Sequence, residues 1–193
     1  MDPEKAAALA REFEGGSKEA FGQLYDAYLK PIYNFIYYKT HHKETAEDLT
    51  AQVFLKAYRS AASYHSSKGT FQAYIYQIAR HAVIDHYRAT RPSLNIDDIW
   101  DLGSNENVAK DAENRILLEK IQLYIKDLPA LQRDIIIMRV WQEMSYTEIG
   151  KIIGKNETSC KMTFSRAIKK LRETMPEAAF ALMLALIIKN QIL

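Results

Sequence analysis

The sequence predicts an all-α fold of two small helical domains joined by a flexible acidic linker. First, the 193 residues include only seven glycines and five prolines, which favours long uninterrupted elements. Second, apolar residues recur at intervals of three and four, as on one face of a helix, with little strict alternation. Third, residues 92–112 lose this periodicity and carry five acidic residues against one lysine. A chain of this length has room for two domains on either side of such a linker.

The first domain is expected over residues 1–91, as a bundle of helices with a shared core. A short N-terminal helix ends at a Gly-Gly pair, and Ser17 is a favoured N-cap for the helix that follows. That helix contains Pro31, which removes a backbone donor and is expected to kink or divide it. The helices of this domain are expected over residues 1–13, 21–38, 44–60 and 70–91.

The second domain, residues 113–173, contains a predicted helix-turn-helix. Ser145 and Glu148 have the spacing of a capping box. Gly154 can end that helix in a left-handed conformation, and Asn156 can cap the next one. The helices of this domain are expected over residues 113–126, 129–142, 145–154 and 157–171.

Positive charge is concentrated in the last of these helices. From Lys151 to Arg172 there are seven basic residues and one acidic residue, whereas the whole chain has a net charge of only +2. A solvated amphipathic helix with lysines on its wet face is one interpretation. The capped helix and glycine turn before it favour a DNA-recognition helix instead. The outward-facing residues on this helix are Thr158, Ser159, Lys161, Met162, Ser165, Arg166 and Lys169.

Several classes of function are disfavoured by the sequence. The single cysteine excludes an internal disulfide, and no Cys/His cluster has the spacing of a zinc site, so neither a metal nor another cofactor is expected. His81 and Asp85 lie one helical turn apart, but no nucleophile or Gly-rich phosphate loop accompanies them. We therefore predict no catalytic residues and no small-molecule substrate. The N-terminus lacks an apolar signal core, which predicts a cytoplasmic protein.

Three stretches together resemble the bacterial RNA polymerase sigma factors of the extracytoplasmic function type, within the sigma-70 family. They are AEDLTAQVFLKAYRS (46–60), GTFQAYIYQIARHAVIDHYR (69–88) and LPALQRDIIIMR…MSYTEIGKIIG (128–154). The resemblance implies a region 2 domain, a linker and a region 4 domain. It also implies three partners: core RNA polymerase, through its beta-prime clamp helices and beta flap, promoter DNA, and an anti-sigma factor able to hold the protein at the membrane. The alternative is a helix-turn-helix regulator that acts without polymerase.

The resemblance implies that one helix of the first domain binds the clamp helices of the beta-prime subunit. On a helix, Glu47, Asp48 and Gln52 share an exposed face, whereas Phe54 and Leu55 divide between the core and the partner. Without the resemblance, a solvated charged face is an equally good interpretation. The residues expected to bind polymerase are Glu47, Asp48, Gln52, Phe54, Leu55 and Lys56.

The loop before residue 70 and the helix after it resemble the part of the family that opens DNA at the minus-10 element. Capture of a splayed base by stacking can contribute ~1–3 kcal/mol towards melting. The family usually has asparagine where this chain has His81, which puts the base preference in doubt more than the role of the helix. The residues expected at this element are Tyr64, His65, Tyr74, Arg80, His81 and Arg88.

The family reads the minus-35 element with the basic helix in the major groove. Lys161 and Arg166 are the expected base contacts, because both side chains can pair with guanine edges. Lys169 is expected on a phosphate. The common Lys-Ser-Arg run is replaced here by Lys161-Met162-Thr163, so the promoter sequence is not carried over.

Two segments keep open interpretations. The acidic linker is either a solvating tether or an ordered strand that lies in the basic RNA exit channel of the polymerase. The tail, residues 174–193, is largely apolar but too short to span a bilayer. An extra core helix is one interpretation. The others are an autoinhibitory cover on an apolar groove or a contact with an anti-sigma factor, a membrane surface or another copy of the tail.

Overall fold

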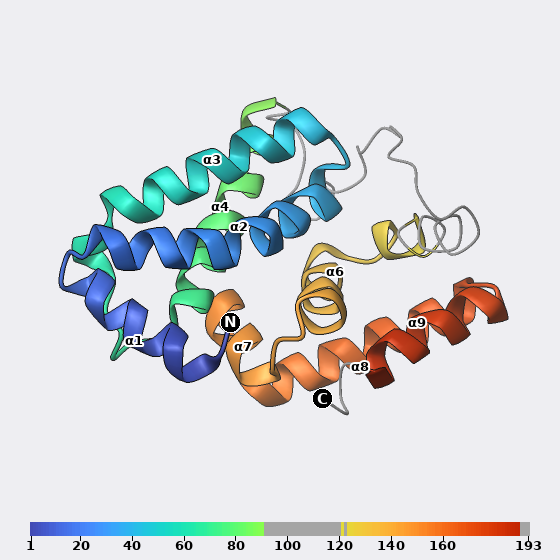
Figure 1. Ribbon diagram of the computed structural model, residues 1–193. Coiled ribbons are helices and arrows are strands. Elements are labelled where there is room, and N and C mark those ends of the chain that lie inside the picture. Colours follow the sequence, from blue (N-terminus) through green and yellow to red (C-terminus); the bar gives the residue numbers. More distant parts are fainter. Residues whose placement is uncertain (91–120, 122, 190–193) are drawn as a thin grey trace. The chain divides into compact units, whose positions relative to one another are not determined.

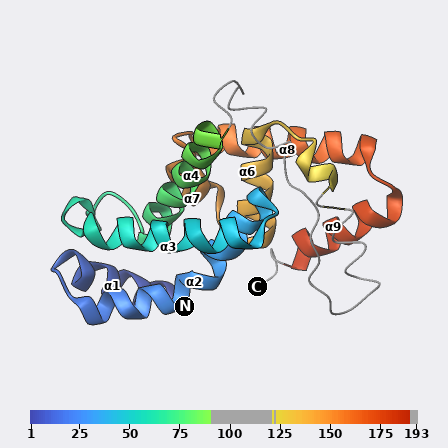
Figure 2. The same ribbon diagram turned by 90° about the horizontal axis from the view of Figure 1, so that it is seen from above.

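The computed structural model describes residues 1–90, 121 and 123–189, and every regular element among these residues is helical (Figures 1 and 2). The all-α prediction is therefore confirmed. Contacts group the chain into two compact units, one built mainly from residues up to 90 and the other mainly from residues after 120. The predicted linker at 92–112, and most of the predicted helix at 113–126, lie outside the described residues.

The first unit is a bundle in which α2 packs against α3, and α3 packs against α4 (Figure 1). A short 3-10 turn, η1, follows α3 and begins the connection to α4. The elements of this unit are α1 (Pro3–Glu14), α2 (Lys18–Thr40), α3 (Lys43–Arg59), η1 (Ala61–Ser63) and α4 (Phe71–Thr90).

Side-chain caps begin two helices of the first unit, one of them at Ser17 as its sequence predicts. The Ser17 hydroxyl accepts a hydrogen bond from the backbone N–H of Ala20 at 3.1 Å. The Thr70 hydroxyl accepts one from the N–H of Ala73 at 3.1 Å. Each cap satisfies a backbone donor that the first helical turn leaves without a partner.

Of the two effects expected of Pro31, a kink or a division of the second helix, the division does not occur. Pro31 lies inside α2, which runs as one helix. The residues after the proline, Ile32, Phe35 and Ile36, are completely buried. Packing of this apolar face outweighs the single backbone hydrogen bond that proline removes, because tertiary contacts supply most of a helix's stability.

The second unit contains the helix-turn-helix and a helix from the C-terminal tail. The predicted helix at 129–142 forms as a short α-helix followed by a π-helical turn. The buried Arg133 guanidinium donates hydrogen bonds to the carbonyls of Lys126 and Leu128. The elements are α6 (Ala130–Ile136), η2 (Ile137–Trp141), α7 (Tyr146–Ile153), α8 (Glu157–Thr174) and α9 (Glu177–Lys189).

The apolar tail forms part of the core of the second unit. Ala179, Met183 and Ile187 of α9 are buried in one cluster with Val140 and Leu171. Helix α9 contacts both α8 and η2. Among the interpretations left open for the tail, these contacts support the extra core helix.

Candidate nucleic-acid and polymerase interfaces

The helix-turn-helix has the local geometry that its sequence predicts. The Ser145 hydroxyl accepts from the backbone N–H of Glu148 at 3.2 Å, and the Glu148 carboxylate accepts from the N–H of Ser145 at 2.8 Å. This reciprocal pair is the capping box. Gly154 ends α7 with φ of 69°, in the left-handed region that favours glycine. Asn156 then caps α8 by accepting from the N–H of Ser159 at 2.7 Å.

A second glycine of this motif has a steric role that the spacing of residues in the sequence does not predict. Gly150 lies inside α7, where its carbonyl accepts a hydrogen bond from the N–H of Lys155 at 3.0 Å. A Cβ atom at Gly150 would overlap the carbonyl oxygen of Lys155. The turn therefore requires a glycine here for space, and the close approach that reveals this is visible only in three dimensions.

Helix α8 presents the expected polar and basic face. Cys160, Ala167 and Leu171 are buried on the opposite side, where burial raises the pKa of the Cys160 thiol and keeps it protonated. Ser159 is half-buried next to the cap, and Met162 is 52% exposed. The other expected contact residues are exposed as well: Thr158, Lys161, Ser165, Arg166 and Lys169.

Lys161 is held by neighbours that sequence reasoning missed. Its ammonium lies 2.6 Å from the Glu157 carboxylate and 5.9 Å from the ring centroid of Tyr146. Hydrogen bonds from Lys161 and then Thr147 lower the pKa of Glu157 below its ordinary value. The guanidinium of Arg139 lies over the same Tyr146 ring at 5.0 Å. Two basic side chains thus lie close to the ring of a tyrosine at the start of the helix-turn-helix.

In the first unit, the face of α3 expected to bind polymerase is exposed. Glu47, Asp48, Gln52 and Lys56 all reach solvent, and Leu55 is 48% exposed. An isolated exposed leucine is common on protein surfaces. Here two tyrosines are exposed as well, one on α3 three residues after Leu55 and one on α2. These aromatic side chains, which the sequence reasoning did not include, are Tyr58 and Tyr25.

Phe54 requires a correction. It is only 3% exposed, and its ring lies edge-on to that of Tyr25 with centroids 4.8 Å apart. Phe54 therefore supports α3 from the core and is not itself a surface contact. Periodicity alone does not distinguish Phe54 from Leu55, because neighbouring residues straddle the boundary between the core and the exposed face.

Tyr64 also requires a correction. It was expected to stack on a base, but it is 3% exposed, with its ring packed against Phe13, Phe71 and Tyr74. Its hydroxyl donates to the carbonyl of Gly69 at 3.2 Å. Burial raises the pKa of Tyr64 to about 12. Tyr64 therefore packs beneath the loop and stabilises it, and its buried ring is not exposed for stacking on a base.

Tyr74 is half-buried and anchors the start of the same loop. Its hydroxyl lies 2.8 Å from the Ser60 hydroxyl and 3.3 Å from the Ser60 carbonyl. The Ser63 hydroxyl donates to that carbonyl at 2.7 Å. Tyr74 therefore positions the loop, whereas His65 is the expected aromatic residue that the loop exposes.

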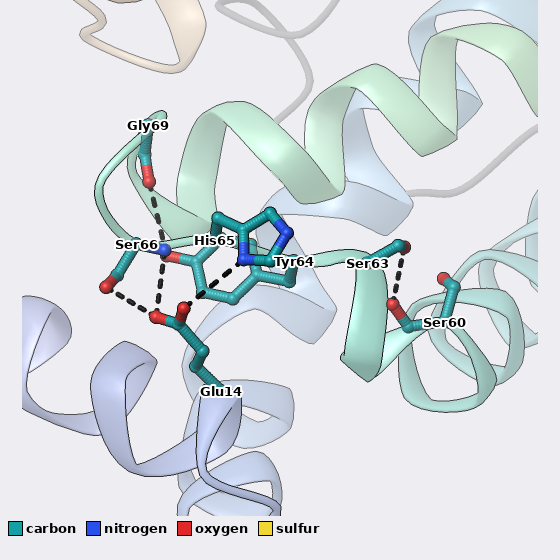
Figure 3. A network of polar contacts seen from close by, with 7 residues as sticks. All are labelled: Glu14, Ser60, Ser63, Tyr64, His65, Ser66 and Gly69. Atoms are coloured by element: carbon teal, nitrogen blue, oxygen red, sulfur yellow. Dashed lines mark hydrogen bonds and ion pairs between the residues drawn. The ribbon is translucent and has the colours of Figure 1, made fainter.

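Glu14 was not identified from the sequence as part of this region. It is the last residue of α1, and its side chain reaches towards the loop that carries His65 and Ser66 (Figure 3). The Glu14 carboxylate accepts hydrogen bonds from the backbone N–H and the hydroxyl of Ser66, at 3.0 and 2.6 Å. A contact across 52 residues leaves no local pattern in the sequence.

The basic residues expected on α4 fall on two sides of the helix. His81 and Arg88 are exposed and share a face with Asp85, which lies 3.9 Å from the Arg88 guanidinium. Arg80 is half-buried. To contact a phosphate, Arg88 must break its surface ion pair with Asp85. Breaking such an exposed pair costs little free energy.

Among the residues that the structure describes, no group of three His, Cys, Asp or Glu side chains is arranged to hold a metal ion. Within the same part of the chain, no helix combines the length and apolar character that crossing a membrane requires.

Comparison with known families matches both units in the order expected. Residues 24–92 match Sigma-70 region 2, and residues 118–171 match Sigma-70, region 4. The ECF RNA polymerase sigma factor BldN of Streptomyces coelicolor is 31% identical over 185 residues, which cover 92% of this chain and 69% of BldN. The RNA polymerase sigma factor YlaC of Bacillus subtilis is 28% identical over 171 residues, with 83% and 95% covered.

Solved structures share the fold at lower identity. CnrH, in complex with the cytosolic domain of CnrY, has a TM-score of 0.67 and 17% identity, with 88% of this chain and 96% of that chain covered. RpoE of Bartonella quintana, in complex with the anti-sigma factor NepR, has a TM-score of 0.64 and 21% identity, with 79% and 94% covered. The two matched regions and the likeness to BldN show that the chain belongs to the extracytoplasmic function type of RNA polymerase sigma factors, which are DNA-binding transcription initiation factors and not enzymes.

Proposed function

We propose that this chain binds core RNA polymerase through α3, opens promoter DNA with the 60–70 loop and α4, and reads the minus-35 element with α8. The observation that carries the proposal is the pairing of a capped helix-turn-helix with an exposed basic face on α8. Both regions of a sigma factor are present in the chain, so one protein can contact two promoter elements.

The polymerase surface centres on Leu55 and the charged residues around it. Leu55 supplies apolar area on a helix whose neighbouring positions, Asp48, Gln52 and Lys56, are polar. An exposed apolar residue ringed by polar groups is the arrangement of an interface core with its rim. Glu47 is already loosely paired with Lys43 at 3.9 Å, so it belongs to the rim.

The minus-10 surface combines His65 with the exposed side of α4. His65 is the aromatic side chain presented by the loop, while His81 and Arg88 extend the surface along α4. An imidazole can stack on an unpaired base, and an arginine can meet a backbone phosphate. Tyr64 and Tyr74 act beneath this surface by fixing the loop.

The minus-35 surface is the exposed face of α8. Arg166 and Lys161 are the proposed contacts to guanine edges, and Lys169, nearer the end of the helix, is the proposed contact to a phosphate. Exposed Met162 and Thr158 add apolar contact of the kind that a thymine methyl group accepts.

An anti-sigma factor is the third proposed partner. RpoE of Bartonella quintana was solved with the anti-sigma factor NepR, and this chain shares its fold. Such a partner would compete with polymerase for exposed surfaces such as α3. Because promoter DNA lies in the bacterial cytoplasm, the protein is proposed to act there, with the anti-sigma factor able to retain it at the membrane.

A pair of variants separates the two main surfaces. Leu55→Ser should weaken binding of the labelled full chain to core polymerase in the absence of DNA, whereas Met162→Ser should leave that affinity unchanged. With saturating polymerase, Met162→Ser should instead weaken promoter binding. Equal core affinity for Leu55→Ser and the wild-type chain would contradict the assignment of α3.

A further inference from the structure

We infer that Glu14 is a positioning residue for promoter opening: its carboxylate fixes the loop that presents His65 to the minus-10 element. This inference rests on the proposed function of that loop. It adds a residue from α1, outside the Sigma-70 region 2 match at residues 24–92.

The contact is specific in its geometry. One carboxylate oxygen of Glu14 accepts two hydrogen bonds from Ser66, from the backbone N–H at 3.0 Å and the hydroxyl at 2.6 Å. The other oxygen lies 3.4 Å from Nδ1 of His65 (Figure 3). The two carboxylate oxygens therefore contact two consecutive loop residues, and one of the hydrogen bonds comes from the loop backbone.

The rest of the loop is anchored at its two ends. Tyr74 and Ser63 hold the start through Ser60, as described above. Tyr64 holds the end through the carbonyl of Gly69. Glu14 supplies the attachment between these ends, beside the exposed His65.

The contact of Glu14 with the loop is accompanied by an apolar contact between α1 and the same loop. The preceding residue, Phe13, is buried with its ring centroid 5.9 Å from that of Tyr64. The end of α1 therefore meets the loop twice, with a ring beneath it and a carboxylate at its surface. Moving the loop requires breaking the carboxylate contact even while the buried rings stay packed.

The charge of Glu14 favours a positioning role over a DNA contact. A carboxylate beside a DNA-binding loop repels phosphates, so direct contact would oppose binding. Here the carboxylate is occupied by donors from the loop, and the hydrogen bonds from Ser66 lower the pKa of Glu14 so that it stays ionised. A loop already held in its binding conformation loses less conformational entropy when it captures a base.

The test uses the full chain with core polymerase on a promoter found by mapping transcript starts with the wild-type protein. Promoter opening is followed by permanganate reactivity of unpaired thymines, and core affinity and thermal melting are measured in parallel. Glu14→Gln and Ser66→Ala should each reduce opening about three- to tenfold, with core affinity unchanged. The loss in the double variant should be smaller than the product of the two single losses, because both changes weaken the same hydrogen bond between the Ser66 hydroxyl and residue 14.

Two controls distinguish positioning from loss of stability or charge. Glu12→Gln makes the same charge change at an exposed site on α1 and should open the promoter normally. Leu9→Ala removes a buried side chain from α1 and should lower the melting temperature without a matching loss of opening. On a template already unpaired across the minus-10 element, Glu14→Gln should recover most of its transcription.

Opening that is equal in Glu14→Gln and Glu12→Gln would overturn the inference while leaving the sigma-factor function intact. Opening that falls in proportion to melting temperature across all variants, Leu9→Ala included, would reduce Glu14 to a stability residue and also overturn it. Absence of promoter-dependent transcription with the wild-type chain would overturn the proposed function and this inference with it.

Discussion

Glu157 and Lys161 form an ion pair at 2.6 Å along the exposed face of α8. The pair spans one helical turn, and Thr147 of α7 donates a further hydrogen bond to Glu157 at 2.8 Å. Lys161, a proposed base contact, is thus directed back towards the start of its helix in the free protein. DNA binding at this position requires the lysine to exchange a carboxylate for a guanine edge.

Removing Glu157 should therefore strengthen promoter binding. Glu157→Gln frees Lys161 and removes a negative charge from the DNA face, and exposed pairs of this kind are weak, so a gain of about twofold or more is expected. The measurement is the affinity of the polymerase holoenzyme for a mapped promoter at fixed salt. Glu173→Gln, an exposed site farther along α8, is the matched control and should give a smaller gain.

Arg166 and Lys169 should have different effects when truncated. Arg166→Ala should cost about 1–3 kcal/mol on the best promoter and relax the preference at one base position. Lys169→Ala should weaken all promoters about equally and reduce the salt dependence of binding by about one counterion. Titration of three promoter variants at several salt concentrations separates these outcomes. A uniform loss from Arg166→Ala would contradict its role in base reading.

The two glycines of the helix-turn-helix should not tolerate alanine. Gly154→Ala places a Cβ in the left-handed region and should cost about 1 kcal/mol of unfolding free energy. Gly150→Ala should cost more, because the turn must shift away from the Lys155 carbonyl. Gly22→Ala is the control. Gly22 lies in α2 with open space around it, so this variant should stabilise the protein by about 0.5–1 kcal/mol.

Helix α9 should contribute directly to the stability of the second unit. Met183 is completely buried against the core cluster, and Met183→Ala should lower the free energy of unfolding by about 2–5 kcal/mol. Ala181→Ser, at an exposed position on the same helix, should change it by less than about 0.5 kcal/mol. Denaturant unfolding of the full chain provides both numbers. Similar stability for Met183→Ala and the wild type would favour a detachable tail.

His86 should make the first unit less stable in mild acid. Burial, and then the charge of His42, lower the pKa of His86 below its ordinary value of 6.5. The unfolded chain therefore binds this proton more readily, and stability falls as the pH drops below 6.5. His86→Gln removes the effect. The loss of unfolding free energy between pH 7.5 and pH 5.5 should be smaller in this variant than in the wild type.

Local features of the fold were predictable from the sequence because they depend on neighbouring residues. The caps at Ser17, Ser145 and Asn156 each satisfy a backbone donor three residues away, so their spacing predicts them. Whether Pro31 divides its helix was not predictable from spacing, because that depends on how tightly the residues after it pack in the core.

The sequence predicted which segments form the candidate site, but not the contacts that hold their side chains in place. An aromatic residue near a loop can either stack on a base or pack beneath the loop, and only the structure assigns Tyr64 to the second role. The contacts of Glu14 with Ser66, and of Lys161 with the Tyr146 ring, join separate elements. Such contacts leave no pattern of spacing in a single sequence.

The most direct test of the proposed sigma-factor function is transcription by purified core polymerase on genomic fragments, with and without this chain, followed by sequencing of transcript starts. A sigma factor should produce new starts that share paired upstream elements, with those starts lost for Leu55→Ser and redistributed for Arg166→Ala. No new starts, together with tight binding of duplex DNA by the chain alone, would contradict this function and indicate a regulator that acts without polymerase.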